Sequence, residues 1–179
     1  MGRRAPAILE FSRVVSVDEI GRDGLVLEIS ADAKERSALA ERFGLESLHA
    51  FEGTARLSAL GDGRVCLKVT FGADVVQSCV VTLEPVTSHI SERFEVVYAP
   101  ATEVEDEAEV FIDVASEEPP EPLIGGRLDV GEMMAQHLAM AIDPYPRSPD
   151  APDGSWHLGE EEAMREGPFD KLKRWKAKG

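Results

Sequence analysis

Cysteine, aromatic residues and positive charge are all scarce in this chain. Its 179 residues include 2 cysteines, 6% aromatic side chains, and 19 Lys or Arg against 34 Asp or Glu, which gives a formal net charge of −15. Two cysteines without a Cys/His cluster disfavour a zinc site and favour buried thiols in a reduced compartment over a disulfide framework. The negative charge repels a phosphate backbone at long range. It is compatible both with simple solubility and with a basic protein partner.

Long apolar runs are also missing. No stretch approaches the roughly 20 apolar residues that span a bilayer, and charged residues interrupt the N-terminus where a signal peptide would be apolar. The 4 histidines are scattered without ligand spacing. No Walker lysine, nucleotide-type GxGxxG or Gly-x-Ser-x-Gly elbow occurs. We therefore expect a cytoplasmic protein that is not an enzyme, does not contact membranes, and uses neither a metal nor a cofactor.

The apolar periodicity predicts a single α+β domain over residues 1–147. Period-two patterns indicate strands over residues 7–15, 25–29, 48–60, 64–71, 75–84 and 94–99. The sequence Gly61-Asp62-Gly63 is typical of a hairpin turn between two of them. We expect an antiparallel β-meander or a partly closed, barrel-like sheet, with two or three helices packed on it.

Two segments change to a helical period. Asp32 is a capping residue before a helix over 33–43, and Gly44 is placed to end it in a left-handed conformation. A second helix is predicted over 129–142, before a proline-rich stretch. Its apolar stripe consists of Met134, Leu138 and Ile142. In this helix Asp129 and Glu132 resemble a capping box, and His137 is expected to be packed or half-exposed beside the stripe.

The run 75–84 is rich in valine and is read as a strand that Pro85 closes. Alternation would place Cys79 and Leu83 on the same face of that strand. Gly72 to Asp74 would allow a bulge just before it. Cys79 has no basic neighbour in sequence that would lower its pKa, so a buried, inert thiol is preferred over a nucleophile.

Composition changes after residue 100. Residues 101–122 hold nine Asp or Glu and no Lys or Arg, and they are predicted to form a solvated acidic loop with an edge strand at 110–114. Residues 148–179 are predicted to be a linker followed by a flexible, basic amphipathic tail. Five of its residues 171–178 are basic, around Trp175. Such a tail suits either contact with RNA or a solubilising helix end, and the sequence leaves both open.

Three segments carry a family resemblance when taken together. They are residues 77–86 (QSCVVTLEPV), residues 126–146, which open with GRLDVGE and end with AIDPYP, and residues 167–172 (GPFDKL). In this order and spacing they resemble the YceD-like family, the large ribosomal RNA subunit accumulation proteins. The residues that match the first family motif are Cys79, Leu83, Glu84 and Pro85. Thr82 stands where the family has a second cysteine, and residues 146–150 lack a further cysteine pair, so no metal site of such relatives is expected here.

The resemblance implies a non-catalytic factor for accumulation or processing of large-subunit ribosomal RNA. Together with the charge pattern, this leads to the hypothesis that the acidic surface binds a basic ribosomal protein of the large subunit or a pre-ribosomal particle, and that the basic tail contacts RNA. The candidate contact residues are Asp129, Glu132, Asp143, Pro144, Tyr145, Pro146, Arg147, Phe169, Lys171, Lys173, Arg174, Trp175 and Lys176. Two other hypotheses stay open: an adaptor unrelated to ribosomes that docks through 129–147, and an RNA-processing hydrolase.

Overall fold

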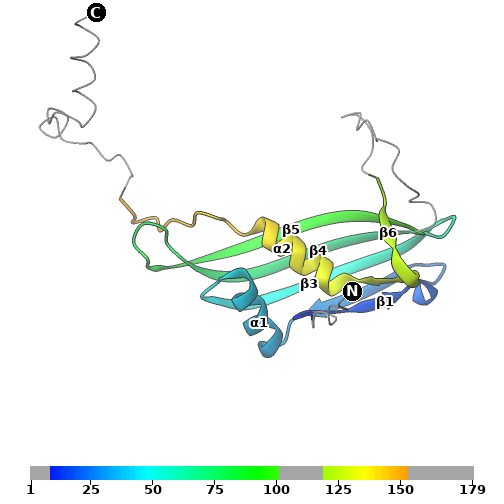
Figure 1. Cartoon of the computed structure of the whole chain (residues 1–179), viewed down its shortest axis with the longest axis horizontal. Helices are drawn as coiled ribbons and strands as arrows, with labels where there is room; N and C mark the ends of the chain where they lie inside the picture. The colour runs from blue at the N-terminus through cyan, green and yellow to red at the C-terminus, as the bar shows by residue number, and fades with distance from the viewer. Residues whose placement is uncertain (1–8, 101–118, 153–179) are drawn as a thin grey trace, which may run out of the picture. The chain divides into compact units, whose positions relative to one another are not determined.

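One open sheet organises the part of the chain that the structure, a computed structural model, describes, namely residues 9–100 and 119–152. The chain divides into two units, Met1–Pro149 and Asp150–Gly179. The sheet has the order β2-β3-β4-β5-β6 (Figure 1). Its strands are β2 (Leu25–Ser30), β3 (Ser47–Gly61), β4 (Arg64–Ser78), β5 (Pro85–Pro100) and β6 (Glu121–Leu123).

Neighbouring strands from β2 to β5 are antiparallel, and β6 runs parallel to β5. A separate two-stranded ribbon pairs β1 (Val14–Ser16) with β7 (Arg127–Asp129). Short 3-10 turns, η1 (Val17–Glu19) and η2 (Ile124–Gly126), adjoin this ribbon. The predicted α+β class and the antiparallel meander are confirmed, and the sheet is open rather than closed into a barrel.

The long β3–β4 hairpin forms because its turn residues tolerate left-handed backbone. Gly61, Asp62 and Gly63 have φ values of 84°, 51° and 74°, and glycine and aspartate adopt such values at low cost. Beyond the turn, Val65, Leu67, Val69 and Phe71 are buried. The predicted hairpin and the predicted inward face of its second arm are both confirmed.

Helix α1 (Ala33–Phe43) has the ends that its sequence predicts. The Asp32 carboxylate accepts the Glu35 N–H at 2.8 Å, and the Glu35 carboxylate accepts the Asp32 N–H at 2.9 Å. This reciprocal capping box satisfies two amide groups that the first turn leaves without helical partners. Gly44 ends the helix in the left-handed conformation, with φ of 66°.

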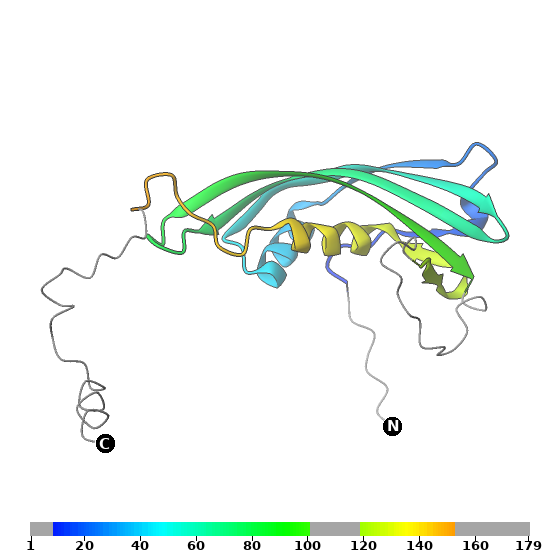
Figure 2. The ribbon, with the colours of Figure 1, turned by 90° about the horizontal axis from the view of Figure 1, so that it is seen from above.

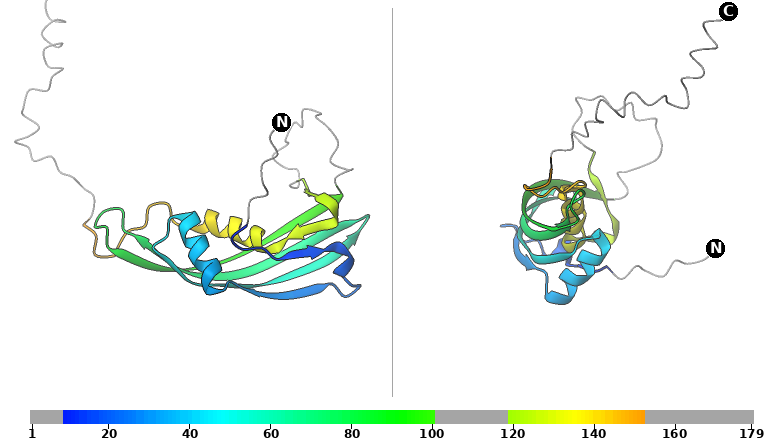
Figure 3. Two further views of the ribbon diagram at one scale, coloured as in Figure 1. Left: turned by 60° about the horizontal axis from the view of Figure 1, so that its bottom comes forward. Right: turned by 90° about the vertical axis from the view of Figure 1, so that its left-hand side faces the viewer.

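Helix α2 (Val130–Ala141) lies across the concave side of the curved sheet, which we call the inner face (Figures 2 and 3). Met134 and Leu138, two members of the predicted stripe, are fully buried. Asp129 caps the helix by accepting the Glu132 N–H at 3.1 Å. Only this half of the predicted capping box forms, because the Glu132 carboxylate turns to Arg42 instead. Among the described residues, no helix is long and apolar enough to cross a membrane.

A chain of ring contacts joins the inner face to α2. Phe51 packs against Phe11 with ring centroids 5.1 Å apart and against Phe71 at 5.6 Å, and Phe71 contacts Phe94 at 6.4 Å. Phe94 then stacks on His137 of α2, with centroids 3.6 Å apart and planes within 3°. Burial lowers the pKa of His137, which favours the neutral ring in this stack. The expectation of a packed histidine is confirmed.

The predicted strand 75–84 is wrong in its second half. β4 ends at Ser78, residues 79–84 form a turn, and Pro85 begins β5 instead of closing a strand. This turn is not recognised from the sequence, because a run of β-branched valines is typical of a strand. Proline is acceptable at the first position of a strand, where its missing N–H has no ladder bond to make.

Three smaller expectations also fail. β1 is confined to Val14–Ser16. The residues before it are held by other contacts: the Arg13 N–H donates to the Asp129 carboxylate before α2, and the Arg13 guanidinium donates to Glu35 of α1. β5 includes residues 87–93, which the sequence placed before a strand. The two register irregularities lie in the pairing of β3 with β4, at Leu48/Ala50 and at Ala59/Gly61, while β4 pairs with β5 without a break through 72–74. The predicted strand 110–114 and the predicted tail fall outside the described residues.

Replacing Gly53 by alanine should destabilise the protein, because the added Cβ would lie 2.6 Å from the Thr70 carbonyl oxygen, 2.8 Å from the Phe71 Cβ and 3.0 Å from the Met134 Cε. We expect a loss of about 1–3 kcal/mol in the free energy of unfolding, measured by urea titration. Gly72→Ala is the matched control, because its Cβ would have no neighbour closer than the His89 ring, at 3.5 Å. Equal stability of the two variants would contradict this account of α2 packing.

Candidate functional site

The turn after β4 and the segment after α2 lie against each other, although more than 60 residues of sequence separate them. The Val80 N–H donates to the Pro146 carbonyl at 2.9 Å. The Gln77 side-chain amide donates to the Asp143 carbonyl at 2.8 Å. We call residues 79–84 together with residues 143–148 the turn site. It contains most of the first family motif and the proline-rich end of the second.

The turn has a strained backbone at an apolar residue. The Cys79 N–H donates to the Glu84 carbonyl at 2.8 Å, and the Leu83 N–H donates to the Cys79 carbonyl at 2.9 Å. Leu83 thereby has φ of 63°, in the left-handed region that leucine rarely adopts. Strained backbone of this kind concentrates at binding and switching sites, where the surrounding structure holds it in place.

Three backbone N–H groups converge on the Cys79 sulfur. Val81 and Thr82 donate at 3.4 Å each, and Ser148 donates at 3.3 Å. The Ser148 N–H, followed by the Thr82 hydroxyl and N–H, lowers the pKa of the Cys79 thiol to about 6. The thiol is buried, as predicted. The expectation of an ordinary pKa is wrong, because hydrogen bonds to the thiolate stabilise it without any basic neighbour.

The turn site presents a set of apolar side chains to solvent, which we call the turn surface. Its members and their exposed fractions are Val80 50%, Val81 43%, Leu83 76% and Tyr145 74%. Exposed apolar groups that cluster on rigid backbone are typical of protein-binding patches. Tyrosine is a frequent anchor in such patches, because it offers apolar area together with a polar tip. This arrangement can bind a partner.

The other candidate residues of the turn site have mixed exposure. Asp143 accepts the Tyr145 N–H at 2.9 Å, which closes a tight bend. Pro146 is buried, whereas Asp143, Pro144 and Arg147 are exposed. Glu84 and Pro85 lie exposed at the start of β5. The candidates from Phe169 to Lys176 lie outside the described residues.

Asp129 and Glu132, by contrast, are occupied within the protein and lie on a different part of it. Asp129 accepts the Arg13 N–H at 2.7 Å and the Ser12 hydroxyl at 2.5 Å. Glu132 receives both guanidinium nitrogens of Arg42 at 2.9 Å, and this pairing lowers the pKa of Glu132. These contacts fasten residues 10–13 and α1 to the start of α2. We therefore assign both carboxylates a structural role.

Sequence reasoning missed Val80 and Val81 as surface residues. Both were read as part of a strand, because nothing in their identity signals a turn. The left-handed position is occupied by Leu83 and not by glycine or asparagine, which would have marked it. The Glu84-Pro85 pair was the one sequence signal of a turn here. It was ambiguous, because proline can stand at the beginning of a strand as well as at its end.

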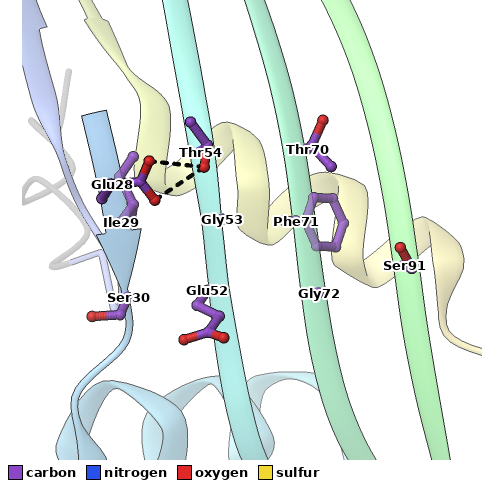
Figure 4. Close-up of a pocket in the computed structure, with 10 residues that line it drawn as sticks. All are labelled: Glu28, Ile29, Ser30, Glu52, Gly53, Thr54, Thr70, Phe71, Gly72 and Ser91. Atoms are coloured by element: carbon purple, nitrogen blue, oxygen red, sulfur yellow. Dashed lines mark hydrogen bonds between the residues drawn. The ribbon is translucent and has the colours of Figure 1, made fainter. Parts of the chain in front are cut away.

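A shallow polar groove of 570 Å³ lies on the opposite, outer face of the sheet (Figure 4). The view in Figure 4 looks onto this face with α2 behind the strands. Glu28 and Glu52 border the groove, and Glu28 accepts the Thr54 hydroxyl at 3.0 and 3.1 Å. Within residues 9–100 and 119–152, no three His, Cys, Asp or Glu side chains are grouped to hold a metal ion.

Comparison with known proteins gives one match. The family model described as "Large ribosomal RNA subunit accumulation protein YceD" matches residues 67–177. No curated protein and no solved structure matches the chain. The matched region includes most of β4, the turn site and α2, so the same family that the sequence motifs resembled is found by an independent comparison.

The pKa of Cys79 predicts a pH-dependent stability. Because the folded-state pKa is about 6 and a free thiol has a pKa of about 8.5, the unfolded chain binds a proton in this interval that the folded state has released. The contribution of Cys79 to the free energy of unfolding should therefore rise between about pH 6 and about pH 8.5 and be absent below pH 6.

The measurement is chemical denaturation of wild type and Cys79→Ser from pH 5.5 to pH 9. We expect the stability difference between the two proteins to widen as pH rises. Cys66→Ser is the control, because burial raises the pKa of that thiol. A difference between wild type and Cys79→Ser that stays constant with pH would contradict the assignment.

Proposed function

Because the chain belongs to the YceD family of large ribosomal RNA subunit accumulation proteins, we propose that it acts as a non-catalytic binding factor in that process and binds its partner through the turn surface. The observation that carries this proposal is the junction of two family motifs at one site. Hydrogen bonds hold the segments together, and their apolar side chains point to solvent.

The geometry supports binding because the turn surface is already ordered in the free protein. The bonds from Val80 and Ser148 cross between the two segments, so a partner would not need to order them. Preorganised contacts of this kind lose less entropy on association than a mobile loop does. Leu83 and Tyr145 are the most exposed members and are the expected anchors.

The proposed partner is a protein of the large ribosomal subunit or its precursor particle. Ribosomal proteins that bind RNA are basic, and a formal net charge of −15 would attract them at long range. Close contact would then form at the apolar turn surface. A role in ribosomal RNA accumulation also implies that the protein works in the bacterial cytoplasm. The basic residues of the tail, 171–176, would add a contact with RNA.

Replacing both anchors should remove the protein from precursor particles. In Leu83→Asn with Tyr145→Ser, asparagine keeps the left-handed conformation at residue 83 accessible while the apolar groups are lost. Loss of apolar hot spots typically weakens association by about tenfold or more. We expect wild type to sediment with large-subunit precursors in a sucrose gradient at low salt, and the double variant to stay near the top.

Ile124→Asn is the matched control, because Ile124 is 75% exposed and lies in η2, outside the turn site. It should sediment as wild type does. Co-sedimentation of the double variant to the same extent as wild type would refute the turn surface as the contact. A wild type that remains at the top of the gradient would refute the ribosomal role and favour an adaptor that uses the same surface for another protein.

Removal of residues 168–179 tests the tail separately. Five basic residues in 171–178 would neutralise phosphates, so truncation should reduce the salt-sensitive part of the association. The readout is the fraction of protein in precursor peaks between low salt and about 0.5–1 M salt, where the screening length falls to a few ångströms. If the truncated and full-length proteins show the same salt dependence, the tail does not contact RNA.

A further inference from the structure

The outer face of the sheet carries basic residues on three neighbouring strands. Arg56 on β3 lies directly opposite Lys68 on β4, and Arg93 on β5 lies opposite Thr70, one position diagonal to Lys68. We call Arg56, Lys68 and Arg93 the cationic row. Strands are about 4.8 Å apart, so the row spans roughly 10 Å across the sheet. A shallow hollow of 520 Å³ lies among these three residues.

Two members of the row have no partner within the described part of the chain. The side chains of Arg56 and Arg93 are exposed and form no hydrogen bond or ion pair with any residue of 9–100 or 119–152. Lys68 pairs with Glu95 at 2.9 Å. The residues that line the hollow therefore carry three positive charges and one negative charge, that of Glu95. The guanidinium groups of the two arginines are available to bind a ligand.

The placement of these charges lowers the stability of the folded protein when no anion is bound. Like charges directly opposite on neighbouring strands repel each other, and Arg56 faces Lys68 in this way. An anion in the hollow would remove this repulsion. Guanidinium groups suit phosphate in particular, because their planar donors can form two parallel hydrogen bonds to its oxygens. The Thr70 hydroxyl, which has no partner among the described residues, adds a neutral donor.

We propose that the outer face of β3, β4 and β5 binds the phosphate backbone of RNA through Arg56, Lys68 and Arg93. The choice of RNA rests on the proposed function, whereas the row itself is a property of the sheet. This contact lies on the face opposite α2 and involves neither the turn surface nor the tail. It permits a partner protein and the RNA to be held by different surfaces of one molecule.

The overall acidity of the chain does not prevent such a contact. At physiological ionic strength the screening length is about 8 Å, so a phosphate in the hollow is affected mainly by the nearest charges. Long-range repulsion from a net charge of −15 would slow association and discourage binding at other positions. It would thereby favour the cationic row over the acidic parts of the surface as a place for RNA.

The test compares two triple variants of the full chain with equal charge change. The first is Arg56→Gln, Lys68→Gln and Arg93→Gln. The control is Arg22→Gln, Lys34→Gln and Arg127→Gln, three exposed cations outside the row that have no partner among the described residues. Binding of a fluorescently labelled transcript of a large-subunit ribosomal RNA domain is measured by anisotropy between 50 and 200 mM salt, and folding is verified by thermal unfolding.

We expect the row variant to bind at least tenfold more weakly than wild type, and the slope of log K against log salt to fall in magnitude by about 2–3. The control should bind within about twofold of wild type. Equal weakening of both variants would attribute binding to net charge, and unchanged binding of the row variant would exclude the row. Either result overturns the proposal, as does absence of RNA binding by wild type.

The two proposals fail independently. If the row variant loses co-sedimentation with precursor particles but still binds naked RNA as wild type does, the row contacts an acidic protein, and the RNA assignment is wrong. If RNA binding is lost as expected while the turn-surface variant still enters precursor particles, the row assignment stands and the turn-surface assignment is wrong.

Discussion

The close approach of α2 to the inner face of the sheet is the contact on which the rest of this structure depends. Gly53 makes it possible, because any side chain there would meet the Thr70 carbonyl and the end of Met134. The ring contacts from Phe51 through Phe71 and Phe94 to His137 then fix the helix across three strands. Each such aromatic pair contributes about 0.5–1.5 kcal/mol beyond its buried area. A chain with few aromatic residues has placed several of them along this one line.

Once α2 is held in this way, the position of the following residues is largely determined. The helix ends at a proline-rich stretch that reaches the turn after β4. There the Val80 N–H donates to the Pro146 carbonyl and the Cys79 sulfur accepts the Ser148 N–H, which completes the turn site. The two faces of the sheet consequently have different roles. The inner face forms the core with α2, while the outer face keeps its polar and charged side chains in solvent.

Much of this architecture was predictable from local sequence. The α1 boundaries followed from Asp32 and Gly44, the hairpin from Gly61 to Gly63, and the stripe of α2 from Met134 and Leu138. Each of these signals acts within a few residues, through a cap, a left-handed turn or a helical repeat. The turn at 79–84 was missed because its conformation depends on bonds to residues 146 and 148, which lie far away in sequence. The distant Ser148 N–H is also the largest cause of the low pKa of Cys79, together with the local Thr82 hydroxyl and N–H.

The sequence by itself determined the fold class, the ends of the helices, the long hairpin and the family, because caps, turn residues, periodicity and short motifs are local properties. Only the tertiary structure decided what those motif residues do. It used Asp129 and Glu132 to fasten the N-terminal segment and α1, it exposed Leu83 and Tyr145 on the two segments of the turn site, and it aligned Arg56, Lys68 and Arg93 across three strands. Strand register and the docking of α2 set these relationships, and both depend on contacts between residues remote in the chain.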